Sequence, residues 1–211
     1  MTNKIDHFAI GTSDLATGIE QMAEVLGMTI PAGGKHVVMG THNALMSTGN
    51  GTYMELIAID EELPAPKRIR WFTLDAPDTK AHIAKRPRAL CWVVATDDIE
   101  RLVANSPVDL GEIITLSRDG RTWRLTVPQD GSLPEHGLLP AFIEWSPGPH
   151  PSQTQPDLGA RLAGVTLTHP NPQALHQTLK ALAIDHLATI TTGPVALSFE
   201  ITTPTGTVIL D

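Results

Sequence analysis

The sequence IDHFAIGTSDLATGIEQMAEVL, residues 5–26, carries the strongest local signals of secondary structure. Its first seven residues favour a strand, because apolar side chains dominate the run and a glycine closes it. Apolar residues then recur at helical spacing over residues 15–26, directly after Asp14, a residue type that caps helices. Strand-like segments follow up to residue 60, so the stretch opens a β-α-β-β-β unit.

The same order of elements returns twice along the chain. Residues 91–103, CWVVATDDIERLV, and residues 163–182, AGVTLTHPNPQALHQTLKAL, each predict a strand followed by a capped helix. We therefore expect an α+β fold of three modules. The expected boundaries are 1–60 for the first module, 61–89 for a connector, 90–146 for the second module, 147–159 for a linker and 160–211 for the third. The unpaired third module would need packing against the first pair, or across a homodimer, to cover its exposed sheet.

Composition excludes several classes of function. Lys and Arg number 15 against 23 Asp and Glu, a net charge of −8, which argues against a general binder of nucleic acid or anionic membranes. The longest apolar run, residues 89–95, is too short to span a bilayer, and no basic-then-apolar leader precedes residue 4. The single cysteine cannot form an intrachain disulfide and favours a reducing compartment. We expect a cytoplasmic protein.

The two connecting segments differ in character. Residues 61–89 hold seven of the 15 Lys and Arg residues. Such a run usually marks a solvated linker, and the alternative is a basic rim that steers anionic substrates. Residues 147–159 are rich in proline and polar side chains, which predicts an ordinary linker.

Three polar residues interrupt strands that otherwise favour burial: His7, Glu55 and Glu144. Carboxylates are rarely buried unless they are paired or bound to a cation. An imidazole and two carboxylates suit a divalent metal, so the sequence predicts that these three residues share a metal site. Taken singly, each has a plainer explanation, with the glutamates facing solvent and His7 hydrogen-bonded in the core.

Several motifs resemble the glyoxalase-like proteins of the vicinal oxygen chelate superfamily. They are HFAIGTSDL at 7–15, GGKHVVMGTHN at 33–43, GTYMELIAID at 51–60 and LPAFIEW at 139–145. The resemblance covers most of residues 4–151 and implies that the first two modules curl into a cup-shaped mixed sheet. It also implies a metal at the cup floor that chelates adjacent substrate oxygens and acts as a Lewis acid.

The superfamily takes one ligand from the first and last strand of each module, and this pattern falls on His7, Glu55, Cys91 and Glu144. Cys91 departs from the hard ligands of many members. Its apolar neighbours favour a core residue, although a thiolate would also ligate zinc or iron. The resemblance thus implies three ligands around a divalent ion (Zn, Fe, Mn or Ni), with Glu144 also acting in catalysis.

Two further groups of residues come from the same motifs. In the glycine-rich run, His36 is expected to act as an acid or base and Asn43 to anchor a substrate oxygen, unless both only shape a loop. In the second module, Arg118 is expected to pair a substrate carboxylate, while Trp92 and Trp123 line an apolar pocket. Both tryptophans would equally suit the core.

The leading hypothesis is a glyoxalase-like, metal-dependent lyase, isomerase or dioxygenase. Its partner would be a small oxygenated organic substrate. The alternative is a metal-free protein that binds or sequesters a small molecule in the same cup, which Cys91 at the fourth ligand position favours.

Overall fold

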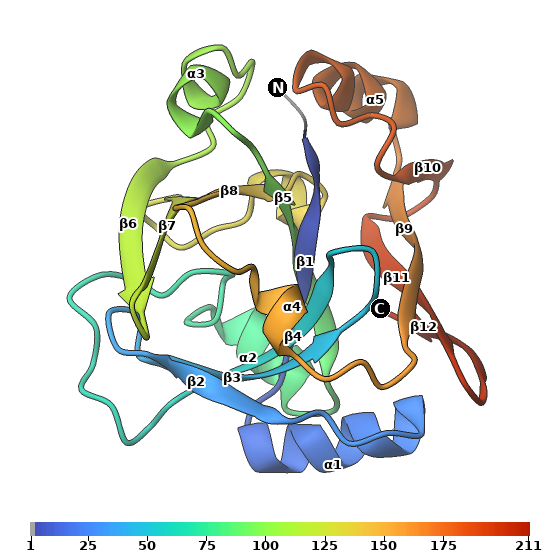
Figure 1. Ribbon diagram of the computed structural model, residues 1–211. Coiled ribbons are helices and arrows are strands. Elements are labelled where there is room, and N and C mark those ends of the chain that lie inside the picture. Colours follow the sequence, from blue (N-terminus) through green and yellow to red (C-terminus); the bar gives the residue numbers. More distant parts are fainter. Residues whose placement is uncertain (1–2) are drawn as a thin grey trace.

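Strands of the first two modules join in one curled sheet, and those of the third form a second sheet beside it (Figure 1). The computed structural model describes residues 3–211, so residues 1–2 of the predicted first module lie outside the described residues. The strand order in the large sheet is β2-β3-β4-β1-β5-β8-β7-β6, and in the small sheet it is β10-β9-β11-β12. The α+β class with repeated modules and a cup-shaped sheet, expected from the sequence, is confirmed.

The first module begins as its sequence pattern predicts. The Asp14 side chain accepts the Thr17 backbone N–H at 2.8 Å and starts the helix, and Gly27 ends it in the left-handed conformation (φ 71°). The elements are β1 (Lys4–Gly11), α1 (Leu15–Leu26), β2 (Ala32–His36), β3 (Thr41–Ser47) and β4 (Tyr53–Ile59).

The second module repeats this order after a connector that carries one short helix, α2 (Pro77–Ile83). Its elements are β5 (Arg88–Ala95), α3 (Ile99–Ala104), β6 (Glu112–Arg118), β7 (Arg121–Val127), a 3₁₀ turn (Pro134–Gly137) and β8 (Ala141–Trp145). Asp98 caps α3 by accepting the Arg101 backbone N–H at 3.0 Å. Antiparallel pairing of β1 with β5 joins the two modules, while each module closes with a parallel pair, β1 with β4 and β5 with β8.

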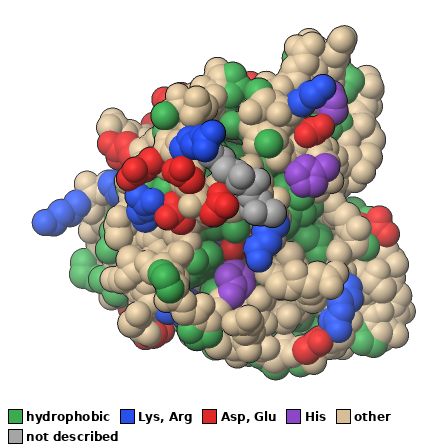
Figure 2. All heavy atoms as spheres, turned by 45° about the horizontal axis from the view of Figure 1, so that its top comes forward, with side chains coloured by type: hydrophobic (Ala, Val, Ile, Leu, Met, Phe, Trp, Pro, Cys, Tyr) green, Lys and Arg blue, Asp and Glu red, His purple; other side chains and the backbone are tan. Residues whose placement is uncertain are grey.

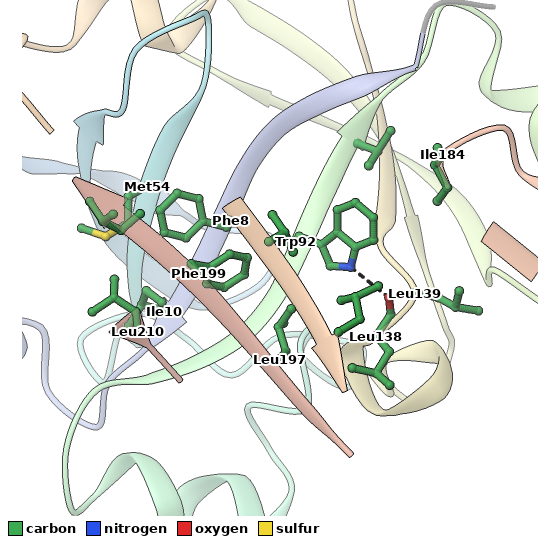
Figure 3. Packing of buried hydrophobic residues seen from close by; sticks show 14 of the residues in the cluster. Phe8, Ile10, Met54, Trp92, Leu138, Leu139, Ile184, Leu197, Phe199 and Leu210 are labelled. Carbon is green, nitrogen blue, oxygen red and sulfur yellow. Dashed lines mark hydrogen bonds between the residues drawn. The ribbon is translucent and has the colours of Figure 1, made fainter. Parts of the chain in front are cut away.

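The third module forms the small sheet. Its elements, preceded by α4 (Pro151–Thr154), are β9 (Arg161–His169), α5 (Pro172–Ala181), β10 (Thr189–Thr192), β11 (Ala196–Thr203) and β12 (Gly206–Leu210). The sheet packs against the convex face of the large sheet, where the rings of Phe8 and Phe199 lie 4.4 Å apart (Figure 3). Of the two packings expected for this module, the structure shows packing against the first pair. The homodimer stays a prediction.

Residues of the central strands alternate between two separate cores. Phe8, Ile10 and Trp92 belong to the cluster shared with the small sheet, and Ala9, Cys91 and Val93 belong to the cluster on the concave face. A fully buried side chain of this size contributes roughly 1.5–3 kcal/mol, so both faces hold the strands in register.

Segment 61–89 is not a solvated linker. Trp71 and Phe72 are buried and cover the concave face, and the Arg68 guanidinium donates to backbone carbonyls of Val127 and Pro128. Arg70 bonds to Asp75 at 2.8 Å. The solvated-linker prediction was wrong because Trp71 and Phe72, although set among charged residues such as Arg68 and Arg70, are buried.

The surface agrees with the charge balance. On the face shown in Figure 2, basic and acidic side chains are interspersed and do not gather in one basic patch. Between residues 3 and 211, none of the helices has both the length and the apolar character that crossing a membrane requires.

Candidate active site

The concave face brings His7 and Glu55 together through the register of two parallel strands. His7 lies opposite Tyr53, and Ala9 lies opposite Glu55, so these positions face the same side of the sheet. The His7 Nε2 atom lies 3.7 Å from Glu55 Oε2, and both side chains are about nine-tenths buried. The ring of Tyr53 stacks on the His7 imidazole with centroids 4.6 Å apart. An imidazole and a carboxylate thus meet at the floor of the cup.

A bulge in β1 adds a second carboxylate on this side. The register with β5 shifts between Ile5 and His7, which leaves Asp6 as an extra residue beside His7. Asp6 is fully buried, and its carboxylate accepts hydrogen bonds from His7 Nδ1 at 2.6 Å, Trp145 Nε1 at 2.9 Å and His150 Nε2 at 2.9 Å. Burial alone would raise the Asp6 pKa, but the bonds from the two histidines outweigh it and hold the pKa well below its usual range.

The ionised Asp6 fixes the proton on His7. A carboxylate only accepts hydrogen bonds, so Nδ1 of His7 must donate to it. In the neutral imidazole the Nε2 atom then carries the free lone pair, and this atom faces Glu55 and the cavity. The arrangement gives His7 the orientation of a general base.

The glycine-rich run places its polar residues over Glu55. Asn43 Nδ2 donates to Glu55 Oε1 at 2.6 Å, while Asn43 Oδ1 accepts the Gly34 backbone N–H at 2.9 Å. A Cβ at Gly33 would come within 2.3 Å of Asn43 Oδ1, so a glycine is needed there for close approach. His36 is buried, which lowers its pKa to about 4 although Glu55 opposes the shift. It is therefore a neutral imidazole at pH 7.

Arg118 closes the site from the opposite edge of the sheet. Its Nη1 atom lies 3.3 Å from His36 Nε2. The guanidinium packs on Gly34, where a Cβ would come within 3.0 Å of Nη1. Edge strands β2 and β6 therefore approach each other across the mouth of the cup (Figure 1).

Six of the residues singled out from the sequence line one cavity of about 40 Å³: His7, His36, Asn43, Glu55, Arg118 and Trp123. Trp71, Phe72, Tyr53, Trp145 and Pro151 complete much of its wall. The structure brings these side chains together.

Glu144 is not part of this group. In β8 the cavity-facing residues are Ile143 and Trp145, so Glu144 points to the convex side of the sheet. There it accepts two hydrogen bonds from Arg124, at 2.8 and 2.9 Å, and one from the Ile99 backbone N–H at 2.9 Å. The prediction that Glu144 binds metal and acts in catalysis was wrong. Successive side chains of a strand point to opposite faces of the sheet, and Glu144 lies one residue away from the positions that face the cavity.

Trp92 is also on the other face. It is fully buried in the core shared with the small sheet, and its indole N–H donates to the Leu138 carbonyl at 3.0 Å (Figure 3). The prediction that Trp92 lines the substrate pocket was wrong for the same reason. The run LCWVVA is apolar at every position, so its pattern does not indicate which residues face the pocket.

The donors present do not fit the expected divalent ion. Residues 3–211 contain no group of three or more His, Cys, Asp or Glu side chains that could hold a metal. Cys91 is a buried core residue, and burial together with the nearby Glu55 raises the pKa of its thiol well above the usual value. Asn43 already engages Glu55, and the positive Arg118 beside His36 would oppose a cation.

Reasoning from the sequence missed Asp6, His150 and Trp71. An aspartate inside an apolar strand was a usable signal for Asp6, since a buried carboxylate needs partners. The composition of residues 147–159 predicts an ordinary linker, yet His150 bonds Asp6 and Pro151 lines the cavity. No sequence pattern indicates that His150 contacts Asp6, which lies more than 140 positions earlier in the chain.

A curled sheet of paired β-α-β-β-β units with polar residues on its concave floor is the architecture that the glyoxalase-like resemblance implies. A model of the glyoxalase-like domain matches residues 5–183, and the chain belongs to this family. The resemblance stated from the sequence is thereby confirmed.

Two solved structures with similarity to the chain differ in how well they match. A hypothetical protein from Staphylococcus aureus is 16% identical, with a TM-score of 0.64, covering 99% of this chain and 84% of that chain. Methylmalonyl-CoA epimerase from Mycobacterium tuberculosis is 18% identical, with a TM-score of 0.45, covering 69% of this chain and 89% of that chain. No curated protein sequence matches the chain.

Proposed function

We propose that this protein is an enzyme that moves a proton on a small oxygenated organic substrate, with His7 as the acid–base group. The observation that carries the proposal is the buried contact between Asp6 and His7 Nδ1, which leaves Nε2 facing the cavity. The reaction would be of the isomerase or lyase type, in which a carbon–hydrogen bond beside a carbonyl group is broken.

Neighbouring groups supply the other requirements of such a reaction. Glu55 lies 3.7 Å from His7 Nε2 and can hold the proton that His7 has taken. Negative charge that develops on the substrate oxygen would be stabilised by the Arg118 guanidinium, a hydrogen-bond donor that lines the cavity and carries a full positive charge. Trp71 and Phe72 are buried and supply an apolar part of the cavity wall.

The metal-dependent version expected from the sequence has less support, because only His7 and Glu55 of its three ligands share the cavity. Elemental analysis of protein purified without chelator tests this directly. We expect far less than one divalent ion per chain, equal in wild type and in His7→Ala. A stoichiometric ion that disappears in His7→Ala would restore the metal hypothesis.

Solvent deuterium exchange tests the proposed function. Small 2-oxo acids, 2-hydroxy ketones and 2-hydroxy aldehydes are incubated in D₂O with the enzyme, and loss of the proton beside the carbonyl is followed by ¹H NMR. We expect exchange of at least one class above the protein-free rate, and a loss of about 10²- to 10⁴-fold in His7→Gln. The matched control, His176→Gln, changes an exposed histidine of α5 and should exchange as wild type does.

Two outcomes contradict the proposal. Exchange that survives in His7→Gln would assign the proton transfer to another group. Saturable binding of these compounds with no exchange in wild type would favour the alternative, a protein that only binds a small molecule.

A further inference from the structure

The inner cavity continues outward into a wider groove. The groove has a volume of about 500 Å³ and lies between the β2–β3 hairpin and the β6–β7 hairpin. His36, Arg118 and Trp123 line both hollows and therefore mark the boundary between them. At about 10–15 Å³ for each water-sized group, the inner cavity accepts roughly three heavy atoms. A larger ligand must leave most of its body in the groove.

Arg118 at this boundary keeps a positive charge without a buried carboxylate partner. Among the described residues its only ion pair is with Asp119, at 3.7 Å, and the Asp119 side chain is 89% exposed. Its other polar neighbour, His36, is neutral at pH 7. By contrast Lys35, the other cation in the groove, is held at 2.8 Å by both Asp60 and Glu62. The guanidinium of Arg118 is thus the cation in this hollow that is open to an anion.

The inner cavity also holds a buried hydrogen-bond donor that has no partner in the part of the chain that the structure describes. The indole of Trp71 is buried, lines the inner cavity and meets the His36 ring edge-on at 5.0 Å. Its Nε1–H has no hydrogen-bond partner in the described structure. A buried donor left unpaired costs about 1–3 kcal/mol, so an oxygen acceptor from a ligand would stabilise it.

The groove beyond Arg118 carries an exposed apolar patch. Val37 and Val38 are 66% and 58% exposed, which is unusual for valine, and they face the same hollow as Leu116 and Trp123. An apolar patch of this kind beside a charge marks a binding surface for a ligand with both characters.

We propose that the substrate is an organic acid whose carboxylate binds Arg118 at the boundary, with its apolar body in the outer groove. Its reacting carbon would then enter the inner cavity that holds His7. The proposal deepens the proposed function and rests on it for the reaction, but not for the binding. Neutral ketones and aldehydes of the same size would bind more weakly, because they leave the guanidinium unpaired.

Binding of a matched acid and amide tests this. Calorimetric titration compares 3-phenylpropionate with 3-phenylpropanamide, and acetate serves as an acid without an apolar body. In wild type we expect the acid to bind about ten- to a hundredfold more tightly than its amide, and more tightly than acetate. In Arg118→Gln the preference for the acid over the amide should disappear. Arg118→Lys should keep part of it, since lysine offers the charge but not the bidentate geometry.

The matched control is Arg101→Gln, which removes an exposed charge on α3 and should retain the full preference. Equal binding of acid and amide in wild type overturns the proposal without any variant, as does absence of acid binding. An acid preference that persists in Arg118→Gln overturns it too. Acid binding through Arg118 with no deuterium exchange would instead contradict the proposed function alone, and exchange confined to neutral compounds would contradict this inference alone.

Discussion

Replacing His36 with glutamine should remove a specific part of the pH dependence of folding. The pKa of His36 is lowered to about 4 because burial penalises its charged form, with Arg118, His7 and His42 adding to the shift and Glu55 opposing it. In the unfolded chain the pKa returns to about 6.5. Folded His36 therefore stays neutral between pH 6.5 and pH 4, where the unfolded form takes up a proton.

The sign and size of the effect follow from that difference. The folded state binds fewer protons than the unfolded state in this window, so the His36 contribution is fully present above pH 6.5 and is lost as pH falls toward 4. At about 1.4 kcal/mol per pKa unit, the shift from 6.5 to about 4 corresponds to a loss of about 3 kcal/mol.

Urea denaturation followed by tryptophan fluorescence between pH 4 and pH 7.5 measures this. We expect the free energy of unfolding of His36→Gln, relative to wild type, to rise by about 3 kcal/mol from pH 7 to pH 4. Titration of groups that do not interact with His36 cancels in the comparison. His176→Gln, at an exposed position, should track wild type throughout. A difference between His36→Gln and wild type that is constant across this range would refute the reasoning.

The remaining predictions concern three positions. Asp6→Asn should lower the free energy of unfolding by about 3 kcal/mol, because an amide nitrogen would face one of the three donors around the buried carboxylate. Calorimetry at pH 7 measures this change. A change below about 1 kcal/mol would show that the hydrogen bonds of Asp6 do not contribute to stability. Glu144→Gln should leave the rate of deuterium exchange within about twofold of wild type and lower Tm slightly, since the contacts of Glu144 lie on the convex face. A large loss of exchange would show that Glu144 takes part in the reaction. Gly34→Ala should displace the Arg118 side chain, because the added Cβ would come within 3.0 Å of Nη1. We expect 3-phenylpropionate to bind about tenfold more weakly, with little change in Tm. Unchanged binding would contradict the packing of Arg118 on Gly34.

Much of the fold was accessible from the sequence because its signals are local. The caps Asp14 and Asp98 and the apolar stripes after them identify the helices, and their recurrence identifies the modules. The face of the sheet to which each strand residue points was harder to predict. Glu144 and Trp92 belong to short runs that are apolar on both sides, so nothing in the sequence assigns their faces.

The site depended on longer-range features. His7 and Glu55 stand out as polar residues inside apolar strands, Asn43 belongs to the glycine-rich motif, and the sheet brings the three together. The bulge at Asp6 arises from pairing with β5, and the contact with His150 depends on where the linker crosses the cup. Neither has a local pattern, because both follow from tertiary packing.

The contact between His150 and Asp6 constrains how this chain can be shortened or recombined. The linker that carries His150 leads directly into the third module, and Pro151 beside it forms part of the cavity wall. A chain cut after the second module would lose a donor to the buried carboxylate along with that wall, so the two curled modules do not amount to a self-sufficient unit. Exchange of the C-terminal module between related chains would have to leave His150 and Pro151 with the first two modules, so the junction of a chimaera belongs after this pair.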